Sequence, residues 1–183
     1  MNITVYLGAS CGSDPVFKEK AAELGRWIGE HGHTLVYGGS KSGLMGVLAQ
    51  SVIGHGGRAI GVEPRFFVEA GYVYDELDEL IVTEDMSERK RKMIELGEAF
   101  IAFPGGTGTL EEIAEVMSKV SLRHLKTPCI LYDLDGYYEG LRQLLEKMKD
   151  KGLSSRERQS GICFAKDLGE IFSILDRISQ VDS

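Results

Sequence analysis

The sequence predicts an α/β protein with a parallel central sheet and helices on both faces. Short apolar runs rich in β-branched residues alternate along the chain with segments of helical spacing, which is the pattern of successive βαβ units. Glycine-rich turns follow three of these apolar runs. The 183 residues contain only 4 prolines and no long linker or repeat, so we expect a single domain over residues 1–183.

Six strands and six helices can be placed in chain order. The expected strands are Ile3–Leu7, Thr34–Tyr37, Ala59–Val62, Leu80–Val82, Ala99–Phe103 and Cys129–Tyr132. The expected helices are Pro15–Glu30, Gly43–Ile53, Ser87–Leu96, Thr109–Leu122, Tyr137–Met148 and Asp167–Ile178, each short enough to cover one face of a sheet. The segment Glu63–Asp78 fits neither pattern, because Pro64 and Gly71 interrupt it. Its clustered aromatic residues predict a loop that helps to wall a pocket.

The composition disfavours several classes of protein. Hydrophobic residues make up 43% of the chain and charged residues 27%, which suffices for a packed core without disulfide or metal staples. The 21 basic and 28 acidic residues give a net charge of −7, which disfavours a nucleic acid partner. Cys11, Cys129 and Cys163 lie far apart with no zinc-ligand spacing, as expected for reduced thiols. No apolar run is as long as a membrane span, and Asn2–Ala9 lacks the basic start of a signal peptide, so we expect a cytoplasmic protein without membrane partners.

Three glycine-rich segments fall where an expected strand leads into an expected helix, namely Gly8–Ser13, Gly38–Gly46 and Pro104–Thr109. In a parallel sheet such turns lie at the carboxyl edge, where ligands bind. Their backbone N–H groups can approach a phosphate closely, and the following helix adds its positive dipole end. Each turn alone could serve only to reverse the chain. Three in equivalent places favour a phosphate or nucleotide site, to which Thr107 and Thr109 can add hydroxyl donors.

Neither of the usual nucleotide-binding fingerprints is present. The phosphate-loop pattern GxxxxGK[ST] does not occur, and GxGxxG fails because the third residue after Gly108 is Glu111. These absences disfavour a phosphate-loop ATPase and an ordinary NAD dehydrogenase.

Glu111, Glu112 and Glu115 fall in the first turns of the helix expected after Gly108. Acidic residues near a helix N-terminus interact favourably with the helix dipole, by about 0.3–1 kcal/mol each, and this alone would account for them. A bound phosphate nevertheless repels a neighbouring carboxylate, so a glutamate in that place indicates chemistry.

The basic run Arg89–Lys92 lies on another expected helix. Arg91 and Lys92 can pair with glutamates four residues away, as on an ordinary helix surface. Arg89 and Lys90 share the inward apolar stripe. A basic group there requires an anion, unless its side chain extends past its apolar neighbours to solvent.

Two longer motifs carry a resemblance to a known family. Met86-Ser-Glu-Arg89-Lys90 is followed by Ala99-Phe-Ile-Ala-Phe-Pro-Gly-Gly-Thr-Gly-Thr-Leu-Glu-Glu112. Further matches, from Val5-Tyr-Leu-Gly to Asp135-Gly-Tyr-Tyr, extend them over most of the chain in one order. The chain resembles the Lonely guy family, the cytokinin riboside 5′-monophosphate phosphoribohydrolases once mislabelled lysine decarboxylases.

The resemblance implies a Rossmann-like three-layer fold and hydrolysis of the N-glycosidic bond of adenine-type nucleoside 5′-monophosphates, with no metal or organic cofactor. It assigns catalysis to Arg89 and Glu112 and the 5′-phosphate to the segment Gly105–Thr109. The implied substrate-binding residues are Ser10, Gly12, Gly39, Ser40, Lys90, Gly105, Gly106, Thr107, Gly108, Thr109, Glu111 and Ser118. Glu69 is the nearest match to a glutamate that the family places after the third strand. The base stays open, because it could be prenylated adenine, plain adenine or another base.

An alternative from another class is a non-catalytic nucleotide or molybdenum-cofactor carrier of the same fold. Such a carrier needs neither a catalytic glutamate nor an arginine that assists bond cleavage. The presence of both Arg89 and Glu112 therefore favours the enzyme.

The apolar residues of the helix that follows the segment Gly105–Thr109 predict a homodimer or a higher even oligomer. At about 100° per residue its apolar residues spread over roughly 240°, whereas one sheet face needs a stripe of only about 100°. These residues are Leu110, Ile113, Ala114, Val116, Met117, Val120, Leu122 and Leu125. The surplus is either a second intramolecular contact or an interface, and the family resemblance also implies an interface.

Overall fold

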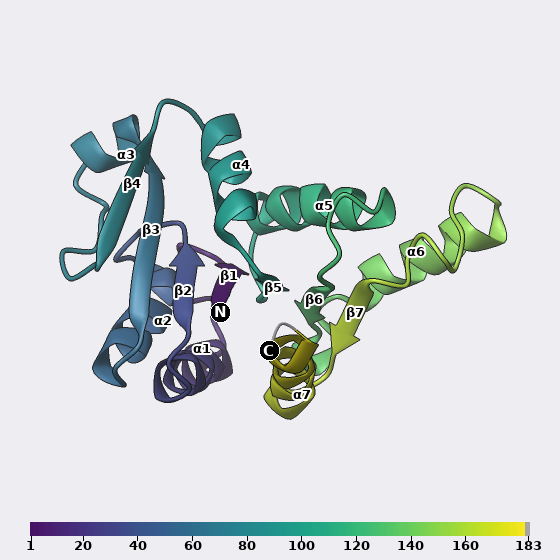
Figure 1. Ribbon diagram of the computed structural model, residues 1–183, viewed down its shortest axis with the longest axis horizontal. Helices are drawn as coiled ribbons and strands as arrows, with labels where there is room; N and C mark the ends of the chain where they lie inside the picture. The colour runs from purple at the N-terminus through teal and green to yellow at the C-terminus, as the bar shows by residue number, and fades with distance from the viewer. Residues whose placement is uncertain (182–183) are drawn as a thin grey trace. The chain divides into compact units, whose positions relative to one another are not determined.

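The computed structural model describes residues 1–181 and divides the chain into two compact units, one from Met1 to Glu98 and one from Ala99 onward. Each unit is built from parallel strands and helices, which confirms the expected α/β class (Figure 1). The expected single domain over residues 1–183 stays a prediction. No helix among the described residues is long and apolar enough to cross a membrane.

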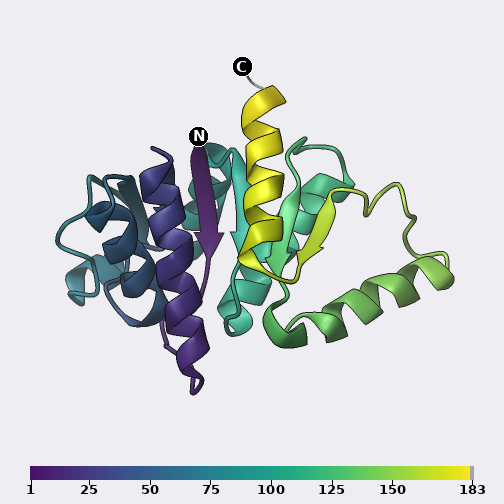
Figure 2. The same cartoon turned by 90° about the horizontal axis from the view of Figure 1, so that it is seen from below.

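The first unit contains four parallel strands in the order β4-β3-β2-β1. They are β1 (Asn2–Tyr6), β2 (Thr34–Tyr37), β3 (Arg58–Pro64) and β4 (Glu79–Thr83). The helices are α1 (Pro15–Glu30), α2 (Gly43–Gly54), the short α3 (Arg65–Glu69) and α4 (Met86–Leu96). α1 and α2 pack against each other on one face of these strands, and α4 lies on the other (Figure 1, Figure 2).

Capping residues explain where two of these helices begin. The Asp14 carboxylate accepts a hydrogen bond from the Val16 N–H at 2.9 Å, and Pro15 occupies the first helical position of α1. Asp85 caps α4 in the same way, accepting from the Glu88 N–H at 2.8 Å. The cap of α4 matters for function, because it fixes the helix that carries the predicted arginine.

The second unit contains three parallel strands in the order β5-β6-β7. They are β5 (Ala99–Ala102), β6 (Cys129–Tyr132) and β7 (Ile162–Ala165). The helices are α5 (Thr107–Ser121), the 3-10 turn η1 (Leu134–Gly136), α6 (Glu139–Asp150) and α7 (Leu168–Val181). α5 packs against β5 and β6, and α7 packs against β6 and β7. α6 has no buried residue and extends away from the strands of this unit (Figure 2).

The expected strands and helices are confirmed, with ends that differ by three residues or fewer. The sequence did not predict β7, because its four residues follow a polar stretch and make no long apolar run. The expectation of an irregular Glu63–Asp78 is corrected in part. This segment begins with the end of β3 and contains α3 before it becomes irregular.

Candidate functional site

The first unit contains a cavity of about 370 Å³ at the carboxyl ends of its strands. The turns after β1 and β2 contribute Ala9, Ser40 and Ser42 to its walls. The segment after β3 contributes Phe67 and Tyr72, whose rings meet edge to face with centroids 5.9 Å apart. The prediction that this aromatic segment helps to wall a pocket is therefore confirmed.

The first two glycine-rich turns touch each other beside this cavity. Gly43 has a φ of +59°, and a Cβ there would lie 2.1 Å from the Ala9 carbonyl oxygen, so only glycine allows this approach. Within the second turn, the Ser40 hydroxyl accepts a hydrogen bond from the Ser42 N–H at 3.1 Å. Within the first turn, the Ser10 hydroxyl accepts one from the Gly12 N–H at 3.2 Å, and both residues are exposed. Of the four predicted residues in these turns, Ser40 lines the cavity itself.

Arg89 is buried on α4 and lines the same cavity, as the inward stripe predicted. Its Nε donates a hydrogen bond to the Val62 carbonyl oxygen at 2.9 Å. The guanidinium occupies space that Gly38 leaves empty, because a Cβ at Gly38 would lie 2.3 Å from Nη2 of Arg89. Its side chain is only 9% exposed, which disfavours the alternative that it reaches past its neighbours to solvent. The neighbouring Lys90 is half-buried.

Glu63 is an acidic group of the cavity that sequence reasoning missed. It is 3% exposed near the end of β3, and a carboxylate oxygen lies 4.0 Å from Nε of Arg89. The φ of Gly39 is +83°, and a Cβ there would lie 2.7 Å from Cγ of Glu63, so this glycine makes room for the glutamate. Glu69, by contrast, is exposed at the end of α3. The signal that could have found Glu63 was an acidic residue at the carboxyl end of an otherwise apolar strand.

In the second unit, the predicted phosphate loop leads from β5 directly into α5. The helix begins at Thr107, two residues earlier than expected, and Gly106 precedes it without a side-chain cap. The N–H groups of the first turn have no partner within a helix, and Gly106, Thr107 and Gly108 are exposed, so an anion can reach them. Thr109 is buried against Gly105, because a Cβ at Gly105 would lie only 2.3 Å from Oγ1 of Thr109. The loop therefore leaves backbone N–H groups open to an anion, and phosphate binding there stays a prediction.

The structure separates the glutamates of α5. Glu112 is only 8% exposed, whereas Glu111 is exposed. Glu115 is half-buried and lies 3.7 Å from the ammonium group of Lys119, an ordinary surface ion pair. Burial of an ionised carboxylate is unfavourable without compensating interactions, so its burial distinguishes Glu112 from the other two glutamates.

The structure does not bring Ser118 to the phosphate loop. It is exposed on α5, eleven positions after Thr107 and therefore about 16 Å further along the helix axis. Its contact with substrate stays a prediction.

Two consecutive tyrosines after η1 support the phosphate loop. The Tyr137 hydroxyl donates a hydrogen bond to the Gly105 carbonyl oxygen, and the Tyr138 hydroxyl donates one to the Phe103 carbonyl oxygen at 2.8 Å. The Asp133 carboxylate accepts from the Tyr138 N–H at 2.7 Å. Burial, followed by the neighbouring Tyr137, raises the pKa of the Tyr138 phenol, which keeps it a donor. In the sequence, Tyr137 and Tyr138 are visible only as part of the motif Asp135-Gly-Tyr-Tyr, which did not predict that they support this loop.

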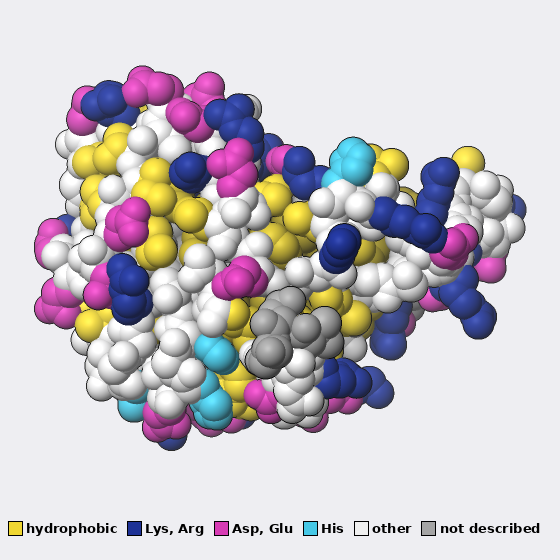
Figure 3. Space-filling model, in the orientation of Figure 1, with side chains coloured by type: hydrophobic (Ala, Val, Ile, Leu, Met, Phe, Trp, Pro, Cys, Tyr) yellow, Lys and Arg dark blue, Asp and Glu magenta, His cyan; other side chains and the backbone are white. Residues whose placement is uncertain are grey.

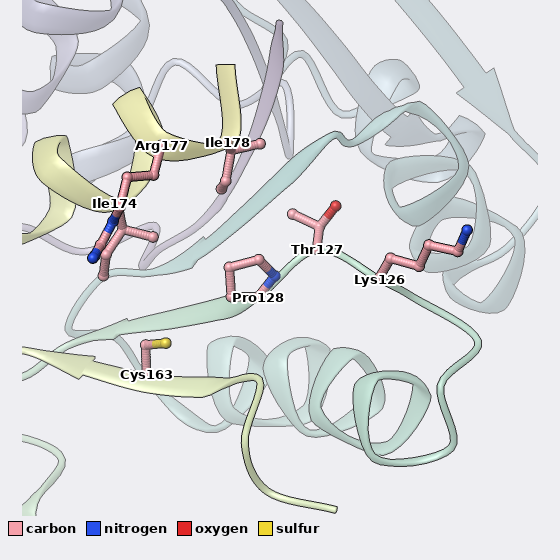
Figure 4. A pocket seen from close by; sticks show the side chains of 7 residues that line it. All are labelled: Lys126, Thr127, Pro128, Cys163, Ile174, Arg177 and Ile178. Atoms are coloured by element: carbon pink, nitrogen blue, oxygen red, sulfur yellow. The ribbon is translucent and has the colours of Figure 1, made fainter. Parts of the chain in front are cut away.

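A second cavity of about 470 Å³ lies in the second unit, at the amino ends of β6 and β7 (Figure 4). Pro128, Cys163, Ile174 and Arg177 contribute to its lining. The phosphate loop follows the carboxyl end of β5, so this cavity lies at the opposite edge of the strands of this unit. It contains no predicted site residue. Among residues 1–181, no group of three or more His, Cys, Asp or Glu side chains could hold a metal ion.

Parallel strands that alternate with helices, three of them ending in glycine-rich turns, define an α/β protein with a Rossmann-like fold. The family model described as "Possible lysine decarboxylase" matches residues 45–175. A cytokinin riboside 5′-monophosphate phosphoribohydrolase of Arabidopsis thaliana is 37% identical over 175 residues, covering 95% of this chain and 80% of its own. One from Rhodococcoides fascians is 38% identical over 170 residues, covering 91% and 85%. The chain belongs to the Lonely guy family, as its motifs predicted.

Solved structures confirm the fold. The molybdenum cofactor binding protein of Rippkaea orientalis matches with a TM-score of 0.73 and 23% identity, covering 97% of this chain and 96% of its own. The molybdenum cofactor carrier protein of Chlamydomonas reinhardtii matches with a TM-score of 0.71 and 23% identity, covering 98% of each chain. At this identity the likeness shows a shared fold and not a shared function.

Proposed function

We propose that the protein hydrolyses the N-glycosidic bond of nucleoside 5′-monophosphates with an adenine-type base, releasing the free base and ribose 5-phosphate. The observation that carries the proposal is the buried Glu112, one helical turn beyond a glycine-rich loop of phosphate-binding geometry. The relatives named phosphoribohydrolases support the same reaction class.

The chemistry assigns a task to each group. Cleavage of an N-glycosidic bond passes through a sugar with oxocarbenium character, which an anion stabilises and water then attacks. Glu112 supplies the anion and the base for water. The loop Gly105–Thr109 holds the 5′-phosphate and so turns remote binding energy into orientation of the sugar. Arg89 binds the phosphate or assists the departing base.

The test is incubation of the protein with AMP, followed by chromatography for free adenine and ribose 5-phosphate. We expect AMP to react and adenosine to remain intact, because the loop cannot hold a substrate without phosphate. Comparable turnover of adenosine would contradict the phosphate assignment. We expect no carbon dioxide from lysine, since no lysine here has a recognisable pyridoxal phosphate context.

A carrier of nucleotide or molybdenum cofactor is the second candidate, favoured by the fold of the solved molybdenum cofactor carrier proteins. A carrier would bind its ligand and release it unchanged. If AMP stays bound to the protein and no adenine forms over hours, the protein is the carrier. If each protein molecule releases many molecules of adenine, it is the hydrolase.

A further inference from the structure

The carboxylate of Glu63 has no task in the reaction proposed above. It lines the cavity of the first unit and is almost fully buried, in space that Gly39 leaves free. Burial of a carboxylate is unfavourable unless charge or hydrogen bonds compensate for it. The Arg89 guanidinium, 4.0 Å away, supplies part of that compensation. Because Glu63 lines the cavity, its carboxylate is placed where it can accept a hydrogen bond from a ligand.

The chemistry of the cavity limits what that ligand can be. Phe67 and Tyr72 offer aromatic surface, and Met45 adds an apolar side chain, which suits a planar ring. A phosphate is disfavoured beside the Glu63 carboxylate. An ionised carboxylate only accepts hydrogen bonds, so the ring must present an N–H group. The part of a nucleotide that meets these conditions is its base.

We propose that Glu63 is a specificity-determining residue that accepts a hydrogen bond from the 6-amino N–H of the base. The inference rests on the proposed function and names its substrate class, which is purine nucleotides that keep at least one N–H on the 6-amino group. The Arg89 guanidinium beside Glu63 offers donors next to this acceptor, and adenine presents ring-nitrogen acceptors next to its amino group. Purines whose 6-amino nitrogen carries no hydrogen cannot donate this hydrogen bond and are therefore bound less tightly.

Three substrates of graded chemistry test this assignment. AMP, N6-methyl-AMP and N6,N6-dimethyl-AMP carry two, one and no N–H groups on the 6-amino nitrogen. For the unchanged protein, we expect kcat/KM for N6-methyl-AMP to lie within a few-fold of that for AMP, and kcat/KM for the dimethyl compound to be about 10- to 100-fold lower. That range is typical of losing a hydrogen bond to a buried charged group.

Variants of Glu63 test whether its carboxylate causes the preference for AMP over the dimethyl compound. Glu63→Met removes the acceptor at similar size, so the preference for AMP over the dimethyl compound should fall to within a few-fold of unity. Glu63→Gln keeps a neutral acceptor and should give an intermediate preference. Glu30→Gln, at the exposed end of α1, is the matched control and should keep the full preference. Equal losses for both nucleotides in Glu63→Met would overturn the proposal. If that variant does not fold, an unchanged preference in Glu63→Gln overturns it.

A binding measurement separates this inference from the proposed reaction. Calorimetric titration of the unchanged protein and of Glu63→Gln with AMP and its dimethyl analogue reports recognition whether or not the bond is cleaved. If neither nucleotide is hydrolysed but AMP binds at least 10-fold more tightly and Glu63→Gln reduces the difference, the hydrolase is wrong and the Glu63 assignment stands. Equal binding of the two nucleotides, together with equal turnover, would disprove the role of Glu63 and leave the hydrolase intact.

Discussion

The position of the Arg89 guanidinium depends on a backbone acceptor and on the space beside a glycine, as well as on Glu63. Val62 supplies the carbonyl oxygen for Nε, and Gly38 leaves the volume into which Nη2 extends. The orientation of this arginine therefore depends on a glycine that carries no functional group.

Gly38→Ala should reduce kcat/KM for AMP by about 10- to 100-fold with little change in melting temperature. The added methyl group would displace the Arg89 guanidinium, but the displaced atoms are the end of a flexible side chain, so the fold can accommodate them. Steady-state kinetics and thermal melting provide the measurements. Gly140→Ala on α6 is the control, because a Cβ there meets no heavy atom within 4 Å. Activity within two-fold of the parent protein would contradict the assigned role of Arg89.

Glu112→Gln should lower kcat for base release by about 10²–10⁴-fold while AMP still binds, because the lost charge is needed mainly when the sugar becomes cationic. Single-turnover assays and calorimetric binding separate the two effects. Glu115→Gln removes the carboxylate that pairs with Lys119 and should leave turnover nearly unchanged. Equal damage from both variants would mean that the wrong carboxylate has been chosen.

The sequence predicted Arg89 and not Glu63 for a physical reason. Helical periodicity assigns each residue of α4 to a face, so an arginine on the apolar stripe is visible from its neighbours alone. Glu63 ends a strand, where alternation stops and an acidic residue is as compatible with a solvent-exposed turn as with a cavity. Its burial depends on Gly39, which is distant in the sequence.

At the level of elements, the predicted phosphate loop is supported by the segment that follows β6. Tyr137 and Tyr138 donate to the carbonyl oxygens of Gly105 and Phe103, which lie on either side of Pro104. These hydrogen bonds connect the segment before α5 to the two residues that follow η1, which lie much further along the chain. Helical periodicity predicted α5 itself, but this tertiary support could not be read from the sequence.

Tyr137→Phe should raise KM for AMP by about three- to ten-fold with little change in kcat. The Gly105 carbonyl loses its donor, so the loop samples more conformations before phosphate binds, whereas the chemical step is unaffected. The measurement is steady-state kinetics with AMP. A fall in kcat at constant KM would instead assign Tyr137 to the reaction itself.

For the whole molecule, the surplus apolar surface of α5 remains exposed. Ile113, Val116, Met117 and Val120 are buried, but Leu110 is 46% exposed and Leu122 57%. Figure 3 shows hydrophobic side chains reaching the surface over α5. A second contact inside the unit therefore does not account for the apolar residues Leu110 and Leu122, which leaves an interface between chains as the explanation that we expect.

We expect light scattering at micromolar concentration to give about twice the 20.1 kDa chain mass, or a higher even multiple. Leu122→Glu places a charge on the exposed apolar stripe and should shift the protein towards the monomer while its circular dichroism stays unchanged. An active protein of single-chain mass would refute the homodimer.

Alkaline pH should destabilise the fold. Burial raises the pKa of the phenols of Tyr37 and Tyr138 and of the Cys129 thiol above their ordinary values. In the unfolded chain these groups titrate at about pH 8.5–10, so above that range the folded chain binds more protons. The free energy of unfolding should be level up to about pH 8 and then fall, by up to about 1.4 kcal/mol per pH unit for each group.

Urea unfolding at pH 7, 9, 10 and 11 would measure this decline, with Cys129→Ala as the comparison. That variant lacks the thiol, which has the lowest pKa of the three groups in the unfolded chain. Its free energy of unfolding should therefore begin to fall at a higher pH. A level stability up to pH 11 in the parent protein would contradict the assigned burial effects.

The close approach of Gly43 to Ala9 has a practical consequence for spectroscopy. It fixes the turn that carries Cys11 against a turn that lines the cavity. Cys129 is buried, and burial raises the pKa values of both the Cys129 and the Cys163 thiols, which slows their reaction with alkylating reagents. A fluorophore added at neutral pH should therefore attach first to Cys11. Its emission would report occupancy of the neighbouring cavity without any engineered cysteine.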